Sequence, residues 1–182
     1  YARLDIPSTA MPAKGYPVII FAHGWVGQEK ADNYNFGYDL TSLAGELING
    51  YVDAGFMVIT PGYLGHGTVD GVQAEGFDIM QSWDNATYLT PTFYAIDLLN
   101  LLEGLSFVNS TDWKKWAGNK MLSPKANLNA INLTGHSQGG DVALTALAVS
   151  GEDSSIKNTF AAASIWSGNI PSRFTQLETF AP

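Results

Sequence analysis

The stretch ANLNAINLTGHSQGGDVAL, residues 126–144, decides how this chain of 182 residues folds. It opens with the alternating apolar pattern of a strand, to which Leu128, Ala130 and Leu133 contribute. A glycine-flanked segment follows, and from Val142 the sequence becomes rich in alanine and leucine, which favours a helix. The pattern therefore predicts a strand, a sharp turn and a helix in direct succession.

The turn reads Gly135-His136-Ser137-Gln138-Gly139, a G-x-S-x-G motif. A serine at the tip of a strand-to-helix turn has a strained backbone and projects its hydroxyl above the sheet. We expect glycine on both sides because a Cβ there would collide with the neighbouring strand or helix. The amide of Gln138 opens the helix and points to where a negative oxygen would be stabilised. Ser137 is thus the predicted nucleophile, and the alternative is that a chain with 19 glycines forms the motif by chance in a loop.

The composition restricts the classes of function. Hydrophobic residues make up 46% of the chain and charged residues 14%, which indicates a globular domain with a substantial core. A net charge of −8 without a Lys/Arg cluster argues against nucleic acid or an anionic membrane as a partner. No apolar run is long enough for a membrane span. We expect no metal and no organic cofactor, because cysteines, metal-ligand clusters and phosphate-binding glycine loops are absent from the sequence.

Apolar runs alternate with helical periodicities along the chain. The predicted strands are an edge strand at residues 1–6, buried strands at 18–22 and 56–60, the strand before Ser137, and a last apolar strand at 160–166. The predicted helices cover residues 40–52, which Asp39 or Thr41 can cap and Gly55 can close, 91–105 with Thr90 as N-cap, and 142–151. Residues 69–89 and 106–125 are predicted as connections. This order indicates one α/β domain over residues 1–182, with a mostly parallel sheet and helices on both faces.

Three motifs in this order resemble the α/β-hydrolase superfamily, in particular its prolyl-oligopeptidase-like and secreted-esterase branches. They are the run Tyr16–Gly24, which ends in His-Gly, the glycine-rich loop Gly62–Gly67, and the turn at Ser137. The resemblance spans residues 16–170 and implies the fold of that superfamily. It says little about the substrate, because the fold hosts many chemistries.

The resemblance also implies an oxyanion hole. The backbone amides of Trp25 and Gln138 would form it beside Ser137. The indole of Trp25 would then line the acyl pocket, and the alternative is that this side chain packs on the helices.

The three histidines of the chain have other roles by the same resemblance. His23 and Gly24 would support the loop of the oxyanion hole, and His66 would bind backbone in the glycine-rich loop. His66 is also the first candidate for a substitute base. His136 occupies the variable position of the motif, with its side chain directed away from that of Ser137.

The sequence does not contain the acid and the base in the expected order. In the superfamily the acid and then a histidine follow the nucleophile, and no histidine follows Ser137. The helix carries Asp141 away from the site, and Asn169 has no charge with which to stabilise an imidazolium. The predicted strand at 160–166 would leave an apolar edge open. We therefore expect an N-terminal portion that lacks its C-terminal strands, a lid that starts near Pro171, and a missing segment or a second chain that supplies Asp and His.

The leading hypothesis is a serine hydrolase that cleaves an ester or a peptide through an acyl-enzyme on Ser137. The aromatic residues Trp25, Tyr63, Phe77 and Trp83 favour an apolar acyl pocket and hence an ester, whereas the prolines before the first motif favour the peptidase branch. The alternative is a non-catalytic binding protein with an incomplete triad. The low lysine content and the habits of the superfamily favour a secreted or periplasmic location.

Overall fold

The structure is a computed structural model that describes residues 2–25, 43–66, 90–113, 123–152, 159–166 and 168, and the backbone of two short strands. Its main sheet has five strands in the spatial order β1-β3-β2-β6-β7. They are β1 (Ala2–Asp5), β2 (Tyr16–Ala22), β3 (Met57–Pro61), β6 (Ala126–His136) and β7 (Phe160–Trp166). The two short strands, β4 (Thr68–Val69) and β5 (Val72–Gln73), form a separate antiparallel pair.

The sheet is mostly parallel, as the sequence predicts. Strands β3, β2, β6 and β7 run in the same direction, and only β1 pairs in the antiparallel sense among the strands of this sheet. Ile20 of the central strand β2 lies opposite Ile59 of β3 and Leu133 of β6, and all three side chains are buried. A continuous apolar run such as β2 is typical of a parallel strand that is covered on both faces.

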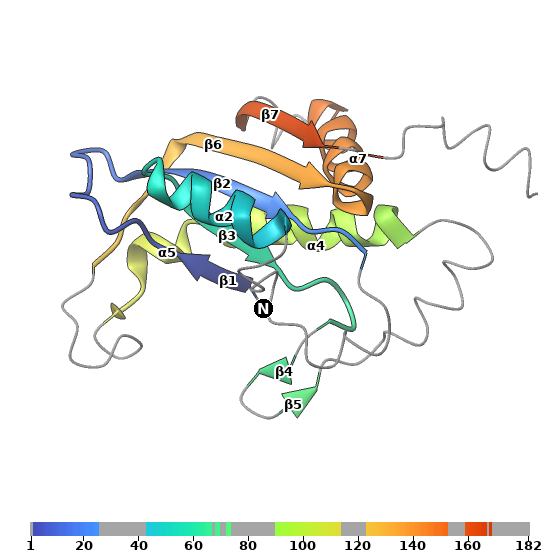
Figure 1. The fold of residues 1–182 in the computed structure, drawn as a ribbon, viewed down its shortest axis with the longest axis horizontal. Coiled ribbons are helices and arrows are strands. Elements are labelled where there is room, and N and C mark those ends of the chain that lie inside the picture. Colours follow the sequence, from blue (N-terminus) through green and yellow to red (C-terminus); the bar gives the residue numbers. More distant parts are fainter. Residues whose placement is uncertain are drawn as a thin grey trace, which may run out of the picture.

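Helices cover both faces of the sheet (Figure 1). On one face, Ile48 of α2 (Leu43–Asp53) packs with Ile19 and Phe21 of β2. On the other face, α4 (Thr90–Gly104) and α7 (Gln138–Glu152) pack together against the alternate residues of the strands. The short helix α5 (Phe107–Ser110) follows α4. The prediction of an α/β fold with helices on both faces is therefore confirmed.

The predicted boundaries differ from the observed ones at a few places. Gly55 closes α2, with a φ of 91° and its amide donating to Val52 O at 3.0 Å, as expected for a helix end. Helix α4 includes Thr90, the predicted N-cap, and α7 starts at Gln138, four residues before the run that predicted it. Strand β5 lies within the predicted loop 69–89, and β4 overlaps the start of this loop at Val69. The proposed caps Asp39 and Thr41 lie outside the described residues.

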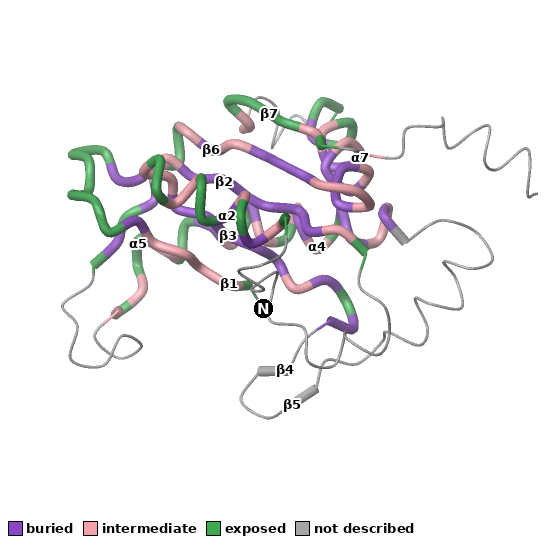
Figure 2. Tube along the Cα trace, in the orientation of Figure 1, coloured by how far each residue is buried: buried purple, intermediate pink, exposed green. Residues whose placement is uncertain are grey.

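Strand β7 is an edge of the sheet that the described residues form. In contrast to β2, most of its residues are exposed, and Figure 2 shows this difference between the two strands. Ala161, Ala162 and Ala163 are exposed, as is Trp166. An open apolar edge was expected at this strand, and the further strands beyond it remain a prediction.

Within the described part of the chain, no helix has the length and apolar character that crossing a membrane requires.

Candidate active site

Ser137 stands at the point where β6 ends and α7 begins. Its φ is 57°, and among the described residues it is the only residue other than glycine with a positive φ. The Ser137 amide donates to Trp166 O of β7 at 2.9 Å, and the Gly140 amide donates to Ser137 O at 2.8 Å. The serine is thus bonded to the sheet through its amide and to the helix through its carbonyl. This is the strained strand-to-helix turn that the G-x-S-x-G motif predicts.

The glycines of the motif permit a close crossing of β6, α7 and β2. A Cβ on Gly135 would overlap the carbonyl group of Gly139. A Cβ on Gly139 would overlap the carbonyl of Ala22 and lie 2.5 Å from His23 O. The expectation that a side chain at either position would collide with a neighbouring element is confirmed. The first turn of α7 therefore lies directly against the end of β2.

The loop after β2 lies against the serine. A Cβ built on Gly24 would lie 3.3 Å from Ser137 Cβ and 3.3 Å from His136 O. These distances are tight for carbon contacts, so glycine at this position lets the loop approach the serine closely. The sequence motif His23-Gly24 and the sequence motif around Ser137 thus meet at one place in the structure.

Two backbone amides of the predicted oxyanion hole belong to the segments that meet here. Gln138 is the first residue of α7, a helix of 15 residues, and its amide has no acceptor within the helix. Such an amide carries part of the positive end of the helix dipole. Trp25 follows Gly24 directly, and 59% of its side chain is exposed. Most of the Trp25 side chain is thus open to solvent, and its role in the acyl pocket stays a prediction.

His23 is fixed beneath this loop. Its side chain is buried, and its ring stacks on Tyr63 with the centroids 4.0 Å apart. His23 Nδ1 lies 2.8 Å from Gly24 O, so Nδ1 carries the hydrogen and donates it. The pKa of His23 is lowered from 6.5 to about 3, mainly by burial and in smaller part by the nearby His66, while the hydrogen bond to Gly24 acts against both. His23 is therefore a neutral imidazole that holds the Gly24 carbonyl.

His66 is also buried and engaged within its own loop. Its amide donates to Tyr63 O at 2.9 Å, and its Nδ1 lies 3.2 Å from Leu64 O. Its ring lies edge-on to those of His23 and Tyr94, with centroid distances of 5.5 and 5.4 Å. Burial lowers the pKa of His66. These contacts hold His66 within the loop after β3, and its role as a substitute base stays a prediction.

The structure corrects the role predicted for Tyr63. The sequence suggested an aromatic wall of the acyl pocket, but the Tyr63 side chain is only 1% exposed. It lies between His23 and Tyr94, the latter parallel to it at 4.4 Å. Its hydroxyl donates to His23 O at 3.1 Å. Tyr63 is thus a buried link between α4 and the loop that approaches Ser137.

Asp97 of α4 is a site residue that the sequence analysis did not identify. Asp97 is half-buried, and its Oδ2 accepts a hydrogen bond from the Leu64 amide at 2.8 Å. Burial raises the pKa of Asp97, and the hydrogen bond from Leu64 acts in the opposite direction. The spacing between Tyr94 and Asp97 could have indicated this position, because residues three apart lie on the same face of a helix and Tyr94 is apolar enough to be buried.

Several predicted residues are only partly placed or lie outside the described structure. His136 is half-buried, and its register partner on β7 is Trp166. Phe77, Trp83, Asn169 and Pro171 lie outside the described residues. The described part of the chain holds no group of three acidic or histidine side chains that could bind a metal ion.

No family model matches this sequence. No curated protein matches it at a significant level.

Among solved structures, the chain is similar to a puromycin-hydrolysing peptidase of Mycobacterium tuberculosis, with 19% identity and a TM-score of 0.52. That match covers 92% of this chain and 20% of the peptidase. A second similar structure is the BES protein from Bacillus cereus, with 15% identity and a TM-score of 0.40, over 98% of this chain and 61% of that protein. This chain therefore spans less than two thirds of either protein. The first likeness shows that the α/β fold of this chain is also the fold of a hydrolase.

Proposed function

We propose that this chain is the nucleophile-bearing part of a serine hydrolase that cleaves an ester, in preference to a peptide, through an acyl-enzyme on Ser137. The observation that carries the proposal is the turn at Ser137. Its positive φ, the helix that starts at the next residue and the close approach of Gly24 occur together at the carboxyl ends of β2 and β6. Carboxyl ends of parallel strands are the usual place for binding in open α/β sheets.

In the proposed reaction, Ser137 Oγ attacks the carbonyl carbon of the substrate and gives its proton to a base. The amides of Gln138 and Trp25 stabilise the negative oxygen that forms. The bond to the leaving alcohol breaks as the base returns the proton to the leaving oxygen, and an acyl-serine remains. Water then attacks the acyl-serine by the same steps and releases a carboxylic acid.

The base and the acid of this reaction come, in our proposal, from polypeptide outside residues 1–182, either a further segment or a second chain. The placement of the histidines supports this. His23 donates Nδ1–H to Gly24 O and is buried, and His66 is buried with Nδ1 against Leu64 O. His136 precedes Ser137 in the turn itself.

The preference for an ester with an apolar acyl group rests on the side chains at the carboxyl ends of the strands. Trp25, Leu64 and Trp166 are large apolar side chains that are 59%, 47% and 48% exposed. The backbone carbonyl of Trp166 also accepts the hydrogen bond from the Ser137 amide. Exposed apolar side chains at one edge of a sheet favour an apolar ligand. We also propose a secreted or periplasmic location, which the low lysine content favours.

The second candidate is a binding protein with the same turn but without catalysis. The observation that favours it is the engagement of His23 and His66 in structural contacts, which leaves the serine dependent on polypeptide from elsewhere. The two candidates differ in whether Ser137 reacts with an electrophile.

A fluorophosphonate probe tests the proposal on the full-length protein. We expect the probe to label Ser137, as identified by peptide mapping, and the label to be lost in Ser137→Ala. Ser110→Ala is the matched control, because Ser110 is exposed and its hydroxyl bonds only locally to Phe107 O. The control should label at the wild-type rate. Absence of label on the wild-type protein would reject the hydrolase and favour the binding protein.

A further inference from the structure

The orientation of the peptide between Gly24 and Trp25 is fixed by His23. His23 Nδ1 donates to Gly24 O at 2.8 Å. The Gly24 carbonyl and the Trp25 amide belong to one planar trans peptide, in which C=O and N–H point in opposite directions. The hydrogen bond to the carbonyl therefore directs the Trp25 N–H away from the His23 ring. A displaced His23 ring would lose this hydrogen bond and leave the peptide without it.

Tyr63 holds His23 through two contacts. Its hydroxyl donates to His23 O at 3.1 Å, and its ring stacks on the imidazole at 4.0 Å with an angle of 28°. The other face of the phenol ring stacks on Tyr94 at 4.4 Å. All three rings are buried. Tyr63 thus fixes both the backbone and the side chain of the residue that orients the peptide after it.

The loop that carries Tyr63 is anchored to α4. Asp97 Oδ2 accepts the Leu64 amide at 2.8 Å, and the His66 amide donates to Tyr63 O at 2.9 Å. Asp97 lies one turn after Tyr94 on the same helix. The contacts therefore form a continuous path from Asp97 through Leu64 and Tyr63 to His23 and the following peptide.

We propose that Tyr63, anchored by Asp97, is a positioning residue that fixes the peptide between Gly24 and Trp25 beside Ser137. Tyr63 does not contact the reacting atoms and acts through His23. Its effect on catalysis rests on the proposed function, in which the Trp25 amide stabilises the negative oxygen. A displaced amide would then slow the chemical step and leave binding of the substrate unchanged.

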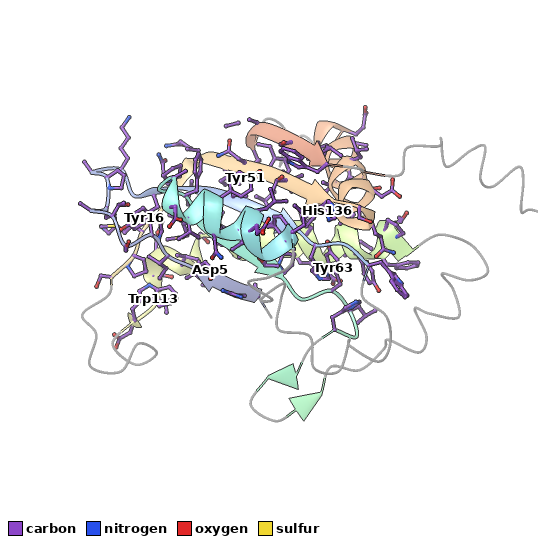
Figure 3. All side chains as sticks on the ribbon, viewed as in Figure 1. Asp5, Tyr16, Tyr51, Tyr63, Trp113 and His136 are labelled. Atoms are coloured by element: carbon purple, nitrogen blue, oxygen red, sulfur yellow. The ribbon has the colours of Figure 1, made fainter. Side chains whose placement is uncertain are left out.

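The test compares Tyr63→Phe with Tyr16→Phe in the full-length protein. Both changes remove a hydroxyl that donates to a backbone carbonyl, since Tyr16 OH donates to Thr9 O at 2.7 Å. Figure 3 shows the two tyrosines at opposite ends of the sheet. The first readout is the ¹H–¹⁵N signal of the Gly24 and Trp25 amides. We expect Tyr63→Phe to move both signals and Tyr16→Phe to leave them in place.

The second readout is hydrolysis of an aryl ester. We expect kcat to fall about tenfold in Tyr63→Phe with KM within about twofold, because loss of one oxyanion donor outright costs a hundredfold or more. Asp97→Ala should lower kcat in the same way. Asp97→Asn keeps an oxygen that can accept the Leu64 amide, so it should restore most of the wild-type kcat.

The outcomes separate the two proposals. Unmoved Gly24 and Trp25 signals in Tyr63→Phe reject the positioning role, whether or not the protein hydrolyses esters. Moved signals with an unchanged kcat, or a rise in KM alone, reject it as well. If kcat falls as much in Asp97→Asn as in Asp97→Ala, the proposed role of Asp97 as the anchor of the Tyr63 loop is rejected. A wild-type protein that neither reacts with the probe nor hydrolyses esters rejects the proposed function, while the amide signals still decide whether Tyr63 fixes the peptide.

Discussion

The contact between Gly24 and Ser137 leaves little room for a side chain. A methyl group at position 24 would lie 3.3 Å from Ser137 Cβ and from His136 O, so the loop or the serine must move by a few tenths of an ångström. We expect Gly24→Ala to slow labelling of Ser137 by a fluorophosphonate about tenfold, since small displacements at a reacting centre are costly. The unfolding free energy should change by less than about 2 kcal/mol.

Gly50→Ala is the control for this change. A Cβ at Gly50 of α2 would meet no atom within 4 Å. The substitution should raise the unfolding free energy by about 0.5–1 kcal/mol, as expected for alanine in place of glycine in a helix, and leave labelling unchanged. Equal labelling rates in both variants would show that the approach of Gly24 to Ser137 has no bearing on reactivity.

At the scale of elements, the crossing of β6 and α7 depends on Gly135 and Gly139. A Cβ on Gly135 would overlap the carbonyl group of Gly139, and backbone cannot yield as the end of a side chain can. We expect Gly135→Ala to lower the unfolding free energy by about 3 kcal/mol, measured by urea unfolding. Gly151→Ala, near the end of α7 with no atom within 4 Å of its added Cβ, should be neutral or stabilising. A stable Gly135→Ala variant would mean that the helix can shift away from the strand.

The strands and the turn at Ser137 could be predicted from sequence because their signals are local. Strand β2 is one apolar run, and the turn at Ser137 is set by glycines two residues away on either side. The first turn of α7 was predicted from the motif alone, because Gln138, Gly139 and Gly140 carry no apolar periodicity.

The contacts beneath the loop after β2 could not be predicted, because they join segments that are distant in sequence. Asp97 binds the amide of Leu64, 33 residues earlier, and Tyr63 binds the carbonyl of His23, 40 residues earlier. The sequence placed Tyr63, in the loop after β3, in an apolar acyl pocket. In the structure it folds beneath the end of β2, where the Tyr63 ring is buried between His23 and α4.

For the whole molecule, the buried histidines determine how stability depends on pH. The pKa of His23 is 6.5 in the unfolded chain and about 3 in the folded protein. Between these values the unfolded chain binds a proton that the folded protein excludes, so acid favours unfolding. We expect the unfolding free energy to fall by about 1 kcal/mol for each pH unit below 6.5. The lowered pKa of His66 acts in the same direction.

Asp97 acts in the opposite direction. Its pKa is raised from 3.8 by burial, so the folded protein keeps this proton to a higher pH than the unfolded chain does. Its contribution to stability therefore grows as the pH falls through the raised pKa and offsets part of the loss.

Urea unfolding from neutral to acid pH measures the combined effect of His23, His66 and Asp97 on the unfolding free energy. His23→Asn should flatten the decline, because asparagine does not titrate and can still donate to Gly24 O. A decline of the same slope in His23→Asn would assign the acid sensitivity to other groups.

The hydrogen bond from the Ser137 amide to Trp166 O joins Ser137 to β7, an edge strand of the described sheet. A single hydrogen bond thus connects Ser137 to a strand whose side chains are largely exposed. A polypeptide that docks along β7 would restrain or shift the Trp166 carbonyl, which accepts the hydrogen bond from the Ser137 amide. We therefore expect a polypeptide that pairs with β7 to change the position of Ser137 through this hydrogen bond.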